Sequence, residues 1–105
     1  MGTKSRVRTK GAPSVLQPNG DLVASTIEDF RKQVRSVLRK SPVSLVLDLS
    51  HVRMVDSVGL GVLIAAHNAF RKKGVKLAVA NVSREIYDLF AAMQLDRHFE
   101  IGKAP

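Results

Sequence analysis

The sequence predicts an α/β fold: one domain with a small mixed central β-sheet and about three to four helices packed on it. Segments of strand and helix character alternate along the 105-residue chain, which favours helices layered on a central sheet. Two runs, residues 43–49 and 75–80, are apolar throughout and of strand length. Such runs are typical of central strands that are covered on both faces.

The N-terminal part predicts a hairpin followed by a helix. An Asn-Gly pair, a frequent hairpin turn, separates two short apolar pieces at residues 15–16 and 22–23. The helix that follows has Ser25 and Glu28 at the spacing of a capping box. Its apolar residues lie on one narrow face, and it ends before Pro42.

The second half of the chain predicts two further helices and a last strand. The second helix covers about residues 58–73, with Gly74 at its C-terminal cap and a basic last turn that suits the helix dipole. The third helix lies within residues 83–95 and has Ser83 as its N-cap. Residues 98–101 are expected to form an edge strand.

Charge is distributed unevenly along the chain. The net charge is +8, and residues 1–11 hold four of the 17 basic residues and no acid. We therefore predict a disordered basic arm over residues 1–12 and a folded domain over residues 13–105. The other basic residues fall mostly on predicted helix faces, and few aromatic residues are available for stacking, so nucleic acid is not the favoured partner.

Composition and motifs argue against several kinds of site. The chain has no cysteine, so it has no disulfide and no thiol chemistry. Its longest uncharged run, residues 57–70, is shorter than the roughly 20 residues of a membrane-spanning helix, and we expect a cytoplasmic protein without membrane insertion. Neither metal-ligand spacing, nor a nucleophile with its base, nor a phosphate-binding glycine loop is present. We therefore expect no enzyme activity, no cofactor and no metal.

The second predicted helix is apolar on nearly every side. On a helical wheel its core face includes Gly59, Leu63 and Phe70, whereas Leu60 and Ile64 fall with the polar residues of the opposite face. Two large aliphatic side chains on a solvated face predict a contact surface for a partner. The alternative is that a loop of the same chain covers them.

Ser57, at the start of this helix, has two interpretations. Serine is a good N-cap, and Asp56 would serve equally well. A hydroxyl at a helix N-terminus is also a favourable place for a phosphate, because free backbone N–H groups and the helix dipole attract anions. A phosphate beside Asp56 and the apolar pair would oppose an apolar interface and would therefore act as a switch.

The motif Asp56-Ser57-Val58-Gly59-Leu60-Gly61 resembles the D-S-[ST]-G-L-G motif in the STAS domain of bacterial anti-sigma factor antagonists. The resemblance covers roughly residues 14–102 and includes an apolar strand ending at Asp48, the Lys72-Lys73-Gly74 helix end and the strand "VKLAVA". The early segment "GDLVAST" is similar to the family's G-x-L-D-A-x-T. The chain departs from the pattern at Val58, where a second hydroxyl is usual, and at Val23, where the family often has aspartate.

The resemblance implies a STAS-like domain that is not an enzyme. It implies that Ser57 is phosphorylated by an anti-sigma factor that is also a serine kinase, that the unphosphorylated form binds this kinase and so releases a sigma factor, and that a serine phosphatase resets the system. The residues expected to bind the partner are Asp21, Ser25, Asp56, Ser57, Val58, Gly59, Leu60, Gly61 and Ile64. The alternative is a constitutive STAS subunit of a phospholipid-transport ABC complex or another signalling assembly, in which Ser57 is only a cap.

Overall fold

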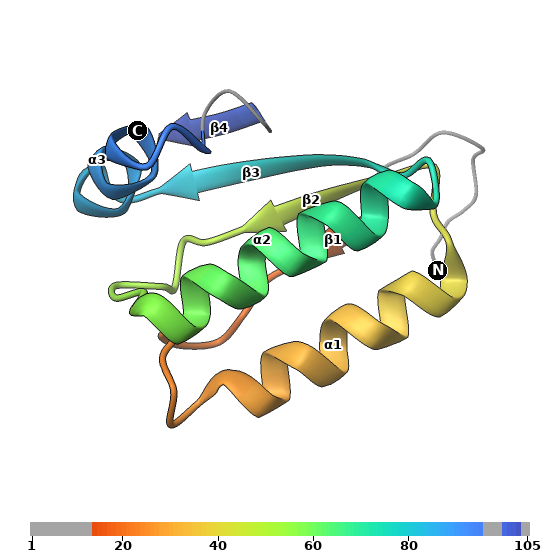
Figure 1. Ribbon diagram of the computed structural model, residues 1–105, viewed down its shortest axis with the longest axis horizontal. Helices are drawn as coiled ribbons and strands as arrows, with labels where there is room; N and C mark the ends of the chain where they lie inside the picture. The colour runs from red at the N-terminus through yellow and green to blue at the C-terminus, as the bar shows by residue number, and fades with distance from the viewer. Residues whose placement is uncertain (1–13, 96–99, 104–105) are drawn as a thin grey trace, which may run out of the picture.

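A computed structural model describes residues 14–95 and 100–103 of the chain. Within these residues strands and helices alternate in the order β1-α1-β2-α2-β3-α3-β4 (Figure 1). The strands are β1 (Ser14–Leu16), β2 (Ser44–Asp48), β3 (Lys76–Val82) and β4 (Glu100–Lys103). The helices are α1 (Ile27–Lys40), α2 (Ser57–Lys72) and α3 (Arg84–Ala92). The α/β fold class, with helices joining strands of one central sheet, is confirmed.

The sheet has the strand order β1-β2-β3-β4, and every described pair of neighbours is parallel. The register places Leu16 beside Leu47, Leu47 beside Val79 and Val79 beside Ile101. The described strands therefore form a parallel sheet and not the mixed sheet that the sequence predicted. A parallel sheet follows from the helical crossovers, because each helix returns the chain to the same end of the sheet.

The predicted hairpin at residues 15–23 is wrong. Strand β1 pairs with β2, and Leu22 instead forms an isolated parallel bridge with Val55 in the loop before α2. Leu22 is only 1% exposed. Burial of this leucine in the core outweighs the local turn preference of the Asn-Gly pair, because the apolar area removed from water stabilises the fold by roughly 2 kcal/mol.

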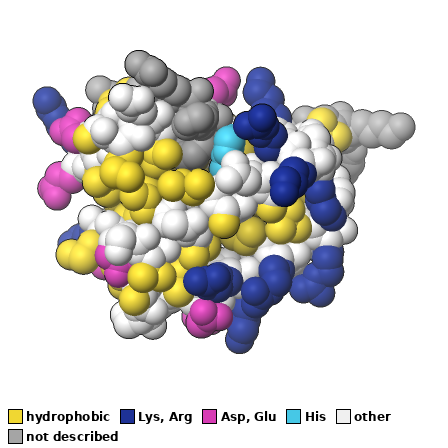
Figure 2. All heavy atoms as spheres, viewed as in Figure 1, with side chains coloured by type: hydrophobic (Ala, Val, Ile, Leu, Met, Phe, Trp, Pro, Cys, Tyr) yellow, Lys and Arg dark blue, Asp and Glu magenta, His cyan; other side chains and the backbone are white. Residues whose placement is uncertain are grey.

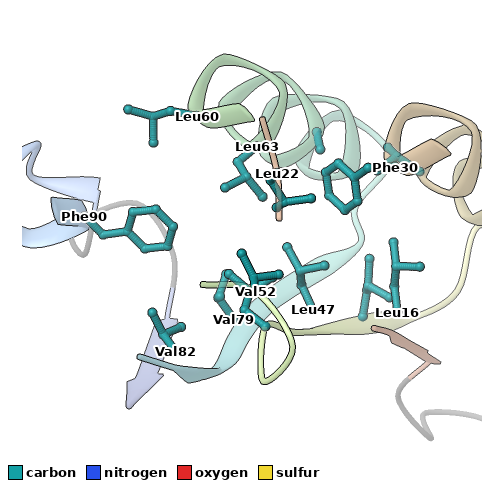
Figure 3. Packing of buried hydrophobic residues seen from close by; sticks show 14 of the residues in the cluster. Leu16, Leu22, Phe30, Leu47, Val52, Leu60, Leu63, Val79, Val82 and Phe90 are labelled. Atoms are coloured by element: carbon teal, nitrogen blue, oxygen red, sulfur yellow. The ribbon is translucent and has the colours of Figure 1, made fainter. Parts of the chain in front are cut away.

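The hydrophobic core lies between one face of the sheet and the three described helices (Figure 3). Leu47 and Val79 point into it from the sheet, and Phe30, Leu63 and Phe90 enter it from α1, α2 and α3 in turn. The side chains of β2 alternate between buried and half-buried. The expectation that this strand is covered on both faces is therefore not met within the described residues, where all three helices pack on one face.

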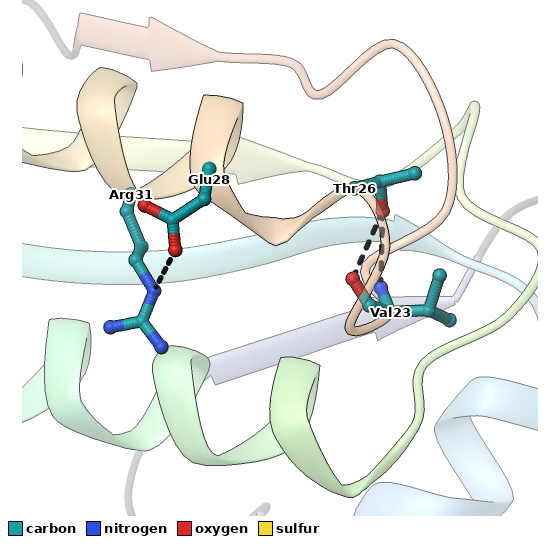
Figure 4. A network of polar contacts seen from close by, with 4 residues as sticks. All are labelled: Val23, Thr26, Glu28 and Arg31. Carbon is teal, nitrogen blue, oxygen red and sulfur yellow. Dashed lines mark hydrogen bonds and ion pairs between the residues drawn. The ribbon is translucent and has the colours of Figure 1, made fainter.

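Helix α1 begins one residue later than the predicted capping box implies. Its N-cap is Thr26, whose side chain makes no capping hydrogen bond. The Thr26 hydroxyl instead bonds to the preceding loop, where it donates to the Asp21 carbonyl at 2.6 Å. It also accepts from Val23 N–H at 3.3 Å (Figure 4). Ser25 is exposed, and Glu28 forms an ion pair with Arg31 at 3.3 Å.

The other predicted helix ends are confirmed. Ser41 ends α1 in the left-handed conformation at φ 45°, Gly74 follows α2 at φ 75°, and the Ser83 hydroxyl accepts from Ile86 N–H at 3.2 Å to cap α3. Strand β4 lies at the sheet edge as expected. The predicted arm over residues 1–12, and the start of the predicted edge strand at residues 98–99, lie outside the described residues.

Candidate functional site

Two loops that are distant in sequence are fastened together at the N-terminal end of α2. Leu22 N–H donates to the Met54 carbonyl at 3.0 Å, and Asp56 N–H donates back to the Leu22 carbonyl at 3.3 Å. The Asp21 carboxylate accepts from both Arg53 N–H, at 2.9 Å, and Met54 N–H, at 3.1 Å. Asp21, expected from the resemblance to bind a partner, thus holds the loop before α2 in place.

Asp56 is the N-cap of α2. One carboxylate oxygen accepts from Gly59 N–H at 2.9 Å, as a capping side chain should. The other accepts from Ala24 N–H at 2.9 Å and so ties the loop before α1 to the same helix end. The Gly59 N–H, followed by the Ala24 N–H, holds the pKa of the Asp56 carboxyl below its ordinary value of 3.8.

Gly59 is required by the close approach of α2 to this loop. A Cβ built on Gly59 would collide with the backbone carbonyl of Leu22. The same carbonyl accepts the Asp56 N–H, so it cannot move away without breaking the contact that positions the helix. A glycine here allows the helix and the loop to touch through their backbones.

Ser57 is the first residue of α2, and its side chain is exposed. Because Asp56 caps the helix, the Ser57 hydroxyl is not used as a cap, and the described part of the chain offers it no hydrogen-bond partner. Close to it in sequence are three further exposed residues: Met54, 59% exposed, Val58, 39% exposed, and Gly61. We call Met54, Ser57, Val58 and Gly61 the mouth surface.

No contact within the described fold requires a glycine at position 61. A Cβ added there would meet nothing within 4 Å, whereas glycine in a helix interior costs roughly 0.5–1 kcal/mol relative to alanine. The two glycines of the motif therefore differ: Gly59 serves packing within the chain, and Gly61 leaves the exposed side of α2 flat. A flat surface of this kind permits another molecule to approach the helix backbone.

The predicted placement of Leu60 on the solvated face is wrong. Leu60 is 8% exposed and belongs to the core cluster, and Ile64 is half-buried against that cluster. In Figure 3 Leu60 leaves α2 on the side where α3 carries Phe90. A helical wheel of α2 could not show this burial, because it depends on how the rest of the fold packs against that side of the helix.

Two further residues that the sequence analysis named, Ser25 and Asp48, lie outside the mouth surface. Ser25 is exposed in the loop that Asp56 holds through Ala24. Asp48, at the end of β2, accepts from Ser50 N–H at 2.9 Å and from the Gln17 side chain at 3.2 Å. The Ser50 N–H in particular lowers the pKa of the Asp48 carboxyl. These contacts tie together the strand ends and the loop that follows β2.

The described residues include no group of three His, Asp or Glu side chains that could hold a metal ion. Among the same residues, no helix combines the length and the apolar character needed to cross a membrane. No sequence pattern indicated two contacts of the site, the Asp56–Ala24 hydrogen bond and the approach of Gly59 to Leu22. Both join segments more than 30 residues apart, which periodicity and local propensity do not connect.

Asp56→Asn is expected to make stability less dependent on pH in the acid range. Because the folded-state pKa of Asp56 is lowered, the stability from its ionised form is present above the ordinary value of 3.8 and is lost as the pH falls through the folded value. The difference in unfolding free energy between parent and variant should thus be largest near neutral pH and should shrink below pH ~4.

Urea unfolding at several pH values, followed by circular dichroism, measures this difference. Asp88→Asn removes the same charge at an exposed position of α3 and serves as the control. An Asp56→Asn difference that stays constant from neutral to acid pH would show that the carboxylate does not hold the two N–H groups.

The sequence of the chain is similar to one protein family and to several named proteins. Residues 4–104 match the family described as STAS domain. The chain is 28% identical over 76 residues to an anti-sigma F factor antagonist of Paenibacillus polymyxa, covering 71% of this chain and 65% of that protein. It is also 28% identical over 82 residues to an anti-sigma-B factor antagonist of Listeria monocytogenes, covering 78% of this chain and 72% of that one.

Solved structures agree in fold. A Thermotoga maritima protein, described as a candidate anti-sigma factor antagonist, superposes with a TM-score of 0.76 at 26% identity, over 85% of this chain and 77% of that one. A sulfate transporter family protein from Wolinella succinogenes superposes with a TM-score of 0.72 at 17% identity, over 85% of this chain and 75% of that one. The second likeness concerns the fold alone.

Proposed function

The chain belongs to the STAS domain family, and we propose that it is an anti-sigma factor antagonist whose binding is switched by phosphorylation of Ser57. In this proposal the unphosphorylated protein binds an anti-sigma factor that is also a serine kinase, and a sigma factor is released. A serine phosphatase restores the unphosphorylated form. The protein itself performs no catalysis, requires no cofactor and acts in the cytoplasm.

The observation that carries the proposal is that Asp56, and not Ser57, caps α2. Asp56 caps α2 through its hydrogen bond from Gly59 N–H, so the exposed Ser57 hydroxyl is left available at the helix N-terminus. In the alternative, a constitutive subunit in which Ser57 serves only as a cap, this hydroxyl should make the capping hydrogen bond. The named relatives, which are anti-sigma factor antagonists, support the same choice.

A phosphate on Ser57 would change binding more than folding. It adds about −1.5 to −2 charges at neutral pH. The N-terminus of α2 stabilises such a charge by only ~0.3–1 kcal/mol at an exposed site, and the neighbouring Asp56 carboxylate opposes it. An apolar partner surface that closed over the dianion would have to remove its water, at a cost several times larger.

The mouth surface is suited to such an interface. Val58 and Met54 offer apolar area around Ser57, and Gly61 allows a partner to come close to the helix backbone. Leu60 is not part of this surface, because it is buried. Ile64 is half-buried and packs against the core cluster.

Val58→Glu is expected to weaken binding of the anti-sigma factor kinase at least ~10-fold, because the new charge would be buried in the interface without a partner. The fold should be retained, since the side chain is 39% exposed. The measurement is isothermal titration with the purified kinase of the source organism. Circular dichroism and thermal unfolding then establish that the variant is folded.

Val15→Glu is the matched control, because Val15 is 64% exposed and lies on β1, away from the mouth surface. This variant should bind the kinase as the parent does. If Val58→Glu binds as tightly as Val15→Glu, the kinase does not contact the mouth surface.

A further inference from the structure

A shallow groove runs between α1 and α2, on the side of these helices that faces away from the sheet. It encloses about 190 Å³. Val34 and Leu38 of α1 and Ala65 and Ala69 of α2 line it. The groove exists because α2 presents alanine toward α1 where larger side chains would fill the space between the helices. None of the groove-lining residues belongs to the mouth surface.

The groove is bordered by cations. Arg31 and Arg35 of α1 line its rim, and Arg31 is paired with Glu28 at 3.3 Å. Figure 2 shows Lys and Arg side chains crowded around an apolar strip on one half of this face. Residues 32–40 and 62–76 contain eight Lys or Arg and no Asp or Glu. This half of the helical layer therefore has a positive potential that no acid of these segments offsets.

The helix dipole accounts for only part of this charge. It favours basic residues in the last turn of a helix, and Arg39 and Lys40 stand there in α1. Arg31 and Arg35 lie upstream of the last turn, and Arg35 is exposed. At the helix ends, Lys73 reaches across to the Leu38 carbonyl at 3.0 Å and fastens α2 to α1. The rim thus lies on two helices that are joined at their C-terminal ends.

The shape and the chemistry of the groove indicate which class of anionic partner fits it. No aromatic residue lines it, so it offers nothing for stacking on nucleic-acid bases. Its alanine and valine side chains do not protrude, whereas insertion into a lipid surface requires large apolar residues that do. A concave apolar floor with arginines on its rim fits an amphipathic helix, whose apolar face enters the groove while its carboxylates meet the guanidinium groups.

We propose that the α1–α2 groove is a second docking site, which binds an acidic amphipathic helix of a partner protein. The site goes beyond the phosphorylation switch, and binding to it does not require Ser57 to be unphosphorylated. Arg35 orients the helix through carboxylate contacts, whereas Arg31 is already paired with Glu28. Ala65 and Ala69 leave room for its apolar side chains.

The probe is a fluorescein-labelled synthetic peptide of about 16 residues, with leucine and alanine on one helical face and glutamate on the other. A peptide of the same composition in scrambled order has the same charge but no apolar face. The full chain should bind the amphipathic peptide at least ~10-fold more tightly than the scrambled one. Because charge is matched, attraction to the basic N-terminal residues contributes equally to both.

Two pairs of variants locate the site. Arg35→Glu should weaken binding at least ~10-fold, whereas Arg84→Glu, the same change at an exposed position of α3, should leave it within about twofold. Ala65→Gln, which fills the groove without changing the charge, should also weaken binding. Asn68→Gln, on α2 but outside the groove lining, should not.

Equal binding of the amphipathic and scrambled peptides, or insensitivity to both Arg35→Glu and Ala65→Gln in variants that remain folded, would overturn the proposal. So would tighter binding of random DNA or of phosphatidylserine vesicles than of the amphipathic peptide, if Arg35→Glu abolished it. Ser57→Asp separates the two sites: it should leave peptide binding unchanged, whatever it does to binding of the kinase.

Discussion

Replacing Gly59 by alanine is expected to lower the free energy of unfolding by about 2–3 kcal/mol, because the new Cβ would overlap the Leu22 carbonyl. That carbonyl cannot yield easily, since it accepts the Asp56 N–H, and Leu22 itself is 1% exposed in the core. Separating α2 from the loop would also lengthen the Asp56–Ala24 hydrogen bond. Urea unfolding followed by circular dichroism measures the loss, which should lower Tm by about 10–20 °C.

Gly61→Ala is the matched control within the same motif. Its Cβ would meet nothing within 4 Å, so the higher helix propensity of alanine should raise the unfolding free energy by ~0.5–1 kcal/mol. Opposite signs for the two substitutions are therefore expected. Equal stabilities for Gly59→Ala and Gly61→Ala would contradict the close packing of α2 on Leu22.

Much of the fold could be predicted because its signals are local. Alternation of apolar strands and amphipathic helices identified the α/β class, and the helix ends at Ser41, Gly74 and Ser83 follow from cap chemistry. Within residues 14–95 and 100–103 the hairpin is wrong and the sheet is parallel rather than mixed. The reason is that the Asn-Gly pair is a local turn signal, whereas Leu22 is placed by a contact with Val55 across the fold.

The site was predictable only in part. The motif located Ser57 and Asp56, and the choice of which one caps α2 needed the geometry. The wheel placed Leu63 and Phe70 correctly in the core. It placed Leu60 on the solvated face, because the periodicity of α2 does not show how the rest of the fold packs against it. The structural roles of Asp21 and Gly59 depend on partners more than 30 residues away, and so no local pattern showed them.

Ser57→Asp is expected to weaken binding of the anti-sigma factor kinase by at least ~30-fold. This corresponds to about 2 kcal/mol or more for burying an unpaired carboxylate in the interface. The free protein should change little in stability, within ~1 kcal/mol, because an acid in the first turn of α2 is favoured by the helix dipole. Titration of the kinase into parent and variant measures the affinity, and thermal unfolding measures the stability.

Ser57→Asn separates the effect of charge on kinase binding from the effect of side-chain size. Ser57→Ala removes the hydroxyl that would accept the phosphate. Asparagine has nearly the size of aspartate without its charge and should bind the kinase far more tightly than the aspartate variant. Alanine should bind like the parent and should not accept phosphate. Equal weakening by asparagine and aspartate would show that bulk, and not charge, opposes the partner at this position.

The most direct measurement is to incubate the full chain with the anti-sigma factor kinase of the source organism and ATP, and to locate the phosphate by mass spectrometry. We expect one phosphate, on Ser57, no phosphate on the Ser57→Ala variant, and release of the phosphorylated protein from the kinase. Phosphate on Ser50 or Ser83 instead, or a Ser57-phosphorylated protein that still binds the kinase as tightly as the parent, would contradict it.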